Sequence, residues 1–227
     1  MSAFGNLLQM QTLFARVLVL FLCMPIHEFA HGYVAYKLGD TTARDQGRLT
    51  LNPFHHLEPV GAISLVLLGI GWARPVSVDS RYFKHPRRDM ALTAAAGPAA
   101  NLVMGFVLMI LFKVLFYLAL SMGVSVGSGT YTLLQMLNLM VQLNIMLAAF
   151  NILPVPPLDG SRILAGFLPP RLAYTYLRYE QQIMLVMLVL LFVGVLDTPL
   201  IWLQNLLWNG VDLATSFVDS ICKSLMF

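Results

Sequence analysis

Long apolar stretches, separated by short polar connections, constrain the fold of this chain more than any other feature. Predominantly apolar segments run over residues 17–36, 91–120, 131–153, 182–196 and 200–217. Most of them approach the roughly 20 residues that a helix needs to cross the hydrocarbon core of a bilayer. Hydrophobic residues make up 58% of the chain and charged residues only 11%, which excludes an ordinary soluble domain. The sequence therefore predicts an all-α polytopic membrane protein with about five full spans.

Residues 60–72 form a shorter apolar segment, which we interpret as a re-entrant segment or a sixth span. If this segment crossed the bilayer fully, the basic residues before it and after it would lie on opposite sides. A half-crossing keeps them together, in line with the excess of Lys and Arg in cytoplasmic loops. We therefore expect residues 37–90 on the cytoplasmic side, with eight of the fourteen basic residues: Lys37, Arg44, Arg48, Arg74, Arg81, Lys84, Arg87 and Arg88.

The same rule predicts the rest of the topology. The N-terminus and the turn at 121–130 are expected outside, and the proline-rich region after residue 153 is expected inside. The basic residues are explained by this topology, so no nucleic acid is expected as a partner. The chain has room for a single membrane-embedded domain over residues 1–227, and the turn at 121–130 is too short for a PDZ or other soluble domain.

A cluster of ionisable residues interrupts the first apolar stretch, in the run His27-Glu28-Phe29-Ala30-His31. Ionisable side chains within a membrane helix are costly and by default indicate a functional site. Residues 27 and 31 project from one face of a helix, so two imidazoles can bind one metal ion while Glu28 reaches a metal-bound water. Pro25 predicts a kink just before this run. Zinc suits such a donor set, and Glu28 can accept the proton of the water.

The third metal ligand is expected in the run Asn151-Ile-Leu-Pro-Val-Pro-Pro-Leu-Asp-Gly160. Its three prolines prevent a regular helix and place Asp159 near the start of the next element. Alternatively, Asp159 serves only as a turn or helix-capping residue. The His pair lacks a carboxylate ligand, which favours a metal role for Asp159.

Both runs resemble the motifs of the site-2 protease family of intramembrane zinc metalloproteases, which belongs to peptidase family M50. Residues 27–31 match its HExxH motif, residues 151–160 match its N-x-x-P-x-P-P-L-D-G motif, and residues 97–101 match its G-P-x-x-N element. Residues 47–53 and 56–61 are similar to a segment of the family's compact, prokaryotic-type subgroup. The resemblance implies that His27, His31 and Asp159 bind Zn²⁺. It also implies that Glu28 is the general base and that Asn151 positions the substrate or stabilises the oxyanion.

The function implied by this resemblance is hydrolysis of peptide bonds within or near transmembrane segments of membrane-protein substrates, by Glu-assisted attack of zinc-bound water. The enzyme would be a multi-pass protein of the cell membrane, in contact with the lipid bilayer, with its active site toward the cytoplasm. The alternative is a non-hydrolytic metal-binding membrane protein, either a transporter or a substrate-binding adaptor. Glu28 favours the enzyme, because a mere binding site needs no base between its ligands.

A substrate-binding edge is expected next to this site. The alternation Arg48, Leu49, Thr50, Leu51 predicts a short strand in a small β-hairpin at the cytoplasmic face, beside which an unwound substrate could add. The alternative is a plain connecting hairpin. Residues expected to contact substrate are Arg48, Thr50, Asn52 and Asn101, although Asn101 could instead form a hydrogen bond between helices. His56 and Glu58 are open alternatives as metal ligands.

Overall fold

The computed structural model describes residue 14 and residues 17–68, 74–125 and 129–226. Within these residues the protein is helical and contains no strand. The elements in chain order are η1 (Val19–Cys23), α2 (Met24–Lys37), α3 (Thr42–Asp45), η2 (Pro53–His55), α4 (Pro59–Leu68), η3 (Ser80–Tyr82), α5 (Pro86–Ser121), α6 (Gly129–Ile152), α7 (Asp159–Phe167), α8 (Pro170–Arg178), α9 (Glu180–Phe192), α10 (Asp197–Ala214) and α11 (Ser216–Met226). The all-helical fold class expected from the sequence is confirmed for the described residues.

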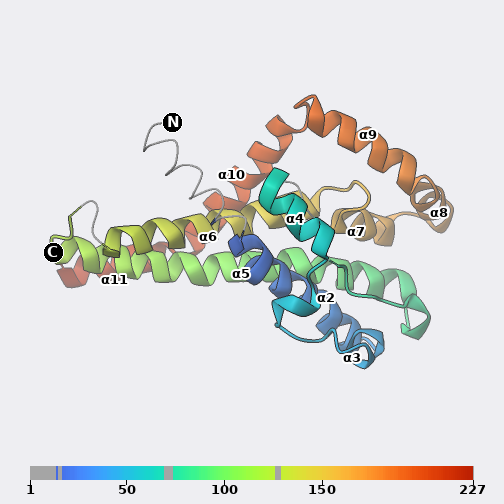
Figure 1. The fold of residues 1–227 in the computed structure, drawn as a ribbon, viewed down its shortest axis with the longest axis horizontal. Helices are drawn as coiled ribbons and strands as arrows, with labels where there is room; N and C mark the ends of the chain where they lie inside the picture. Colours follow the sequence, from blue (N-terminus) through green and yellow to red (C-terminus); the bar gives the residue numbers. More distant parts are fainter. Residues whose placement is uncertain (1–13, 15–16, 69–73, 126–128, 227) are drawn as a thin grey trace.

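Two long helices, α5 and α6, form the centre of the molecule and lie side by side (Figure 1). Their contact is built from buried apolar side chains, and Val211 of α10 joins them. The members of this core are Leu108, Met109, Leu137, Val141, Ile145 and Val211. Small residues bring the two helices close together, since Gly105 of α5 faces Ile145 of α6.

The described residues do not confirm the five full spans expected from the sequence. Two described helices, α5 and α6, are each long and apolar enough to cross a membrane, and α9 and α10 add a third span if that bent pair counts as one. The axes of α9 and α10 differ by 88°, with a turn between them that contains Gly194 at a φ of +79°. The segments 182–196 and 200–217 therefore do not form two antiparallel crossings, and five full spans are not confirmed.

The first apolar stretch is continuous helix from residue 17 to residue 37, with a π-helical turn, η1, directly before α2. α2 crosses α5 near the middle of the molecule (Figure 1). Pro25 is the second residue of α2, just after this π-helical turn, so its missing N–H falls where the continuous helix changes from π to α geometry. Such π-turns often occur at functional sites, and here η1 ends four residues before His27.

The short segment after α3 does not form the expected β-hairpin. Residues 48–52 are an irregular loop that leads into η2 in the described chain. The side chain of Asn52 accepts a hydrogen bond from the N–H of Phe54, and the Thr50 hydroxyl accepts one from the N–H of Asn52. These local bonds, and Pro53 after them, favour a turn over a strand ladder.

Helix α4 covers ten residues, which span about 15 Å, or half the thickness of a hydrocarbon core. The rest of the segment expected to be re-entrant, residues 69–72, lies outside the described residues. Glu58 caps α4, because its carboxylate accepts a 2.5 Å hydrogen bond from the N–H of Gly61.

Ionic side chains attach the C-terminal helices to α5. Lys113 lies in the apolar part of α5 and is buried, and its ammonium group is 2.8 Å from a carboxylate oxygen of Asp212 and 2.6 Å from one of Asp219. The Tyr117 hydroxyl donates a further bond to Asp219. A charged side chain on a membrane helix usually pairs in this way with opposite charge.

Candidate metal centre

The two histidines of the HExxH run lie on one face of α2, and both are buried, with 8% and 9% of their surface exposed. Their Nε2 atoms are 3.0 Å apart, and the rings meet edge to face at 86°. Spacing by four residues produces this arrangement, because it returns the side chain to the same helix face after about one turn.

Asp159 lies far from the two histidines in the chain, and its carboxylate brings a third donor atom next to their Nε2 atoms. It is the first residue of α7, and the proline-rich turn before it keeps Leu158 extended. The Asp159 Oδ2 atom is 3.1 Å from His27 Nε2 and 3.3 Å from His31 Nε2. Gly160 permits this turn, because a Cβ there would collide with the main-chain carbonyl oxygen of Ile152.

The chemistry of this cluster fits zinc. The three donor atoms all lie within 4.8 Å of one another. Two ligands of a tetrahedral zinc ion, each about 2.0 Å from it, are about 3.3 Å apart, close to the separations of the three donor atoms. Asp159 Oδ2 is buried and has no hydrogen-bond donor among the described residues. Two imidazoles and one carboxylate are also a known catalytic zinc set, which leaves a position for water.

Main-chain and amide groups orient both imidazoles. His31 Nδ1 lies 2.7 Å from the carbonyl oxygen of Thr93, which can only accept a hydrogen bond. This contact places the proton of a neutral His31 on Nδ1 and leaves the Nε2 lone pair for a metal. His27 Nδ1 faces the side-chain amide of Asn101 at 3.3 Å, and the buried Asn101 Oδ1 has no partner in the described chain. If the Asn101 amide were rotated by about 180°, its Oδ1 atom would accept a hydrogen bond from His27 Nδ1–H and orient this ring in the same way.

Gly97 of α5 faces the two imidazole rings. A Cβ on this residue would lie 2.5 Å from His27 Cε1 and would also collide with His31 Nε2. Any side chain at position 97 would therefore displace the rings. The glycine of the G-P-x-x-N element is explained by this close approach of the helix backbone to the two imidazole rings.

Glu28, next to His27 in the chain, also contacts the irregular segment 74–79. Its Oε2 atom accepts a 2.8 Å hydrogen bond from the main-chain N–H of Val76. The segment is fixed on both sides of this contact. Arg48 Nη2 donates to the carbonyl oxygens of Arg74 and Pro75, and the buried Asp40 carboxylate accepts a 2.7 Å bond from the N–H of Asp79.

The other expected site residues have different local partners. Asn151 donates from its side chain to the carbonyl oxygen of Leu147, within α6. Thr50 and Asn52 shape the turn before η2. His56 lies outside the metal cluster, because its Nε2 atom is 2.8 Å from the Thr50 carbonyl oxygen.

The main-chain groups that contact Glu28 and His31 could not be identified from the sequence. Val76 and Thr93 act through their main-chain N–H and C=O groups, which give no signal in side-chain identity. Gly97 was visible only as part of the G-P-x-x-N element, and its contact with the rings depends on how α5 crosses α2.

Comparison with known proteins shows extensive similarity to zinc metalloproteases. The model of a family described as peptidase family M50 matches residues 15–194. A putative zinc metalloprotease of Bacillus subtilis, YwhC, is 42% identical over 210 residues, covering 92% of this chain and 93% of that protein. The putative zinc metalloprotease Rip2 of Mycolicibacterium smegmatis is 30% identical over 178 residues, covering 76% and 64%. The zinc metalloprotease MJ0392 of Methanocaldococcus jannaschii is 29% identical over 157 residues, covering 69% of this chain and 35% of that protein. No solved structure matches.

Proposed function

The chain belongs to peptidase family M50 and is a zinc metalloprotease, and we propose that it cleaves other membrane proteins within or next to their transmembrane segments. The observation that carries this proposal is the convergence of His27, His31 and Asp159 beside Glu28, on helices packed against a helix long enough to span a bilayer. An enzyme that cleaves soluble peptides would not need its site next to a helix long enough to span a bilayer.

Each residue of the cluster has a distinct role in the proposed reaction. His27, His31 and Asp159 hold zinc, which supplies Lewis acidity and lowers the pKa of a water molecule to about 7. Glu28 accepts the proton of the attacking water and delivers it to the leaving amine. Val76 keeps the Glu28 carboxylate turned toward the 74–79 segment by its 2.8 Å bond. Asn151 is proposed to stabilise the oxyanion once the substrate has entered.

The substrate must lose its helical structure before it can react. A membrane helix satisfies its own amides by internal hydrogen bonds, so its peptide carbonyls are not presented to a catalytic site until it unwinds. We propose that cleavage occurs toward the cytoplasmic side of the cell membrane, where the basic residues between 37 and 90 would place the site. Asn101 is proposed to orient His27, because its amide already faces that ring.

The test is a comparison of the wild-type chain and Glu28→Gln, purified at full length and measured for bound zinc and for cleavage of candidate membrane substrates. The amide cannot accept the proton, but the three zinc ligands remain. We expect zinc content near that of the wild type and cleavage reduced by about 100-fold or more. Undiminished cleavage by Glu28→Gln would refute the proposed role of this residue. A zinc-loaded wild type that cleaves no membrane substrate would instead favour a non-hydrolytic metal protein.

A further inference from the structure

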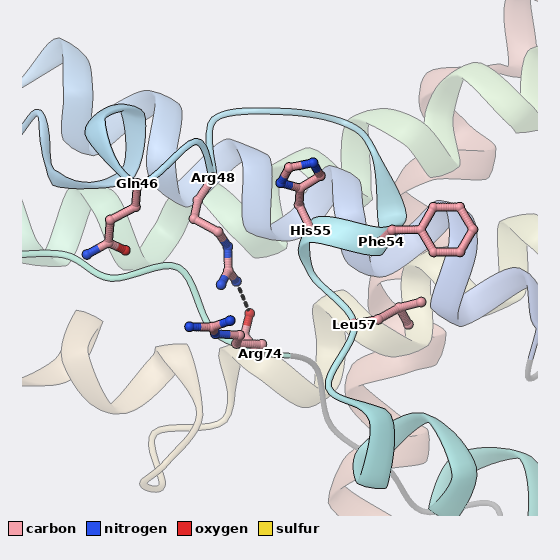
Figure 2. A pocket seen from close by; sticks show the side chains of 6 residues that line it. All are labelled: Gln46, Arg48, Phe54, His55, Leu57 and Arg74. Carbon is pink, nitrogen blue, oxygen red and sulfur yellow. Dashed lines mark hydrogen bonds between the residues drawn. The ribbon is translucent and has the colours of Figure 1, made fainter.

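A pocket that takes no part in the metal site opens beside the 74–79 segment. Its volume is about 530 Å³, within the usual range for small-molecule sites. Figure 2 shows the side chains that line it, which come from the loop after α3, from η2 and from the start of the 74–79 segment. They are Gln46, Arg48, Phe54, His55, Leu57 and Arg74.

The polar side of this pocket is positively charged. Arg48 is only 7% exposed, and its Nη2 atom is used by the carbonyl oxygens of residues 74 and 75. Its Nε atom is buried without a hydrogen-bond partner among the described residues. Arg74 adds a second guanidinium, and none of the six lining residues is acidic. Burial, and then repulsion from Arg74, lower the pKa of Arg48 below its ordinary value. A bound anion would relieve both effects.

The other side of the pocket is apolar and continues into the first apolar stretch. Phe54 is 71% exposed, and its ring meets that of Phe21 in η1 edge to face, with the centroids 5.8 Å apart. Leu57 follows η2 and leads directly into the apolar helix α4. The pocket therefore lies where basic residues border apolar surface, which corresponds to the headgroup level of a bilayer.

We propose that this pocket binds the phosphate group of an anionic phospholipid. The free fork of Arg74 donates to phosphate oxygens, a geometry for which guanidinium groups are well suited, and the buried Arg48 beside it adds a second positive charge. Phe54 and Leu57 contact the glycerol and the first carbons of the acyl chains. A lipid is favoured over an acidic peptide because the apolar wall of the pocket is continuous with Phe21, on a helix of the first apolar stretch.

The position of the pocket links the lipid to the reaction. Arg48 holds the carbonyl oxygens of residues 74 and 75, and the next residue, Val76, holds Glu28. A phosphate on Arg74, next to the positive charge of Arg48, would therefore fix the backbone that orients the general base. Lipid binding can be measured independently of cleavage, so failure of the proposed protease activity would leave this proposal intact.

The experiment compares lipid binding by the full-length wild-type chain, Arg74→Gln and the control Arg171→Gln. The Arg74 side chain can be changed while its carbonyl oxygen still accepts from Arg48. Arg171 is an exposed basic residue of α8 outside the pocket, so its loss gives the same change in net charge. Native mass spectrometry would measure binding of dioleoyl phosphatidylglycerol and dioleoyl phosphatidylcholine, with inorganic phosphate as a competitor.

We expect the wild type and Arg171→Gln to prefer phosphatidylglycerol, and Arg74→Gln to lose about five-fold of that preference while retaining zinc. An unchanged preference in Arg74→Gln, or an equal loss in Arg171→Gln, would overturn the proposal, and the first result would leave an acidic peptide as the occupant. Displacement of the lipid by inorganic phosphate would assign the pocket to a free anion and also overturn it. If Arg74→Gln does not fold, Arg74→Lys replaces it and must bind phosphatidylglycerol more weakly than the wild type.

Discussion

The Glu28 carboxylate and the main-chain N–H of Val76 are joined by a 2.8 Å hydrogen bond, although 48 residues separate them in the chain. This bond fixes the proposed general base from outside the helix that carries it. The segment 74–79 is thus part of the proposed active site through its backbone.

Replacing Val76 by proline removes this donor from Glu28. We expect Val76→Pro to reduce cleavage by about tenfold or more, while zinc content stays at the wild-type level, because no metal ligand is touched. Val76→Ala is the matched control, since it keeps the N–H and loses only side-chain atoms. Cleavage rates and zinc contents of the two purified variants test this prediction. Equal cleavage by both would show that the bond has no catalytic effect.

Adding one methyl group at Gly97 should disturb the metal ligands directly. A Cβ at this position would lie 2.5 Å from His27 Cε1, so the rings must move. We expect Gly97→Ala to weaken zinc binding by about 10- to 100-fold, the range found when groups that orient ligands are altered. Gly105→Ala, on the same helix, serves as the control because its Cβ would meet Ile145 at an ordinary 3.4 Å. Competition with a zinc chelator measures both affinities, and equal values would refute the close approach.

Removing zinc should lower the stability of the protein, because the proposed ligands come from two helices, α2 and α7. With free zinc at 100 times its Kd, binding to the folded state alone contributes about 2.7 kcal/mol. We expect chelation to lower the apparent Tm of the wild type, and Asp159→Asn to lose most of this zinc-dependent increment. Asp197→Asn, an exposed position at the start of α10, should keep it. An undiminished zinc effect in Asp159→Asn would move the third ligand to another residue, with His56 and Glu58 tested next.

The charge of Lys113 should contribute to the stability of the C-terminal helices. Lys113→Met leaves Asp212 and Asp219 without their counter-ion, and breaking a buried ion pair usually costs 3–5 kcal/mol. We expect a smaller cost, about 1–2 kcal/mol, because the carboxylates left behind are 55% and 30% exposed and can turn toward water. Lys113→Arg, which keeps the charge, should lose less. Reversible unfolding in mixed micelles measures the difference, and wild-type stability of Lys113→Met would contradict this estimate.

The sequence could predict the helical class and the pairing of two distant motifs, because both depend on side-chain identity. Spacing by four residues places His27 and His31 on one face, and the prolines before Asp159 end α6 and start a new helix. The structure brings these three residues together, and their role as ligands stays a prediction.

The remaining features could not be predicted, because backbone geometry decides them. The segments 182–196 and 200–217 are each apolar, and composition does not reveal the 88° bend between α9 and α10. The alternation at 48–51 predicted a strand, but Asn52 and Pro53 direct the chain into η2 instead. The Val76 N–H that binds Glu28 and the Thr93 carbonyl oxygen that binds His31 are main-chain groups, which almost any residue at those positions could have supplied.

The Lys113 cluster has a consequence for how the molecule opens. Gly97 and Lys113 lie on one helix about 24 Å apart at 1.5 Å per residue, and they share no partner in the described chain. Interactions that far apart contribute independently to stability. Amide hydrogen exchange should therefore distinguish two units that open separately. Zinc should slow exchange around α2 and α7. The ion pairs of Lys113 should slow exchange around α10 and α11, where removal of zinc should have no effect.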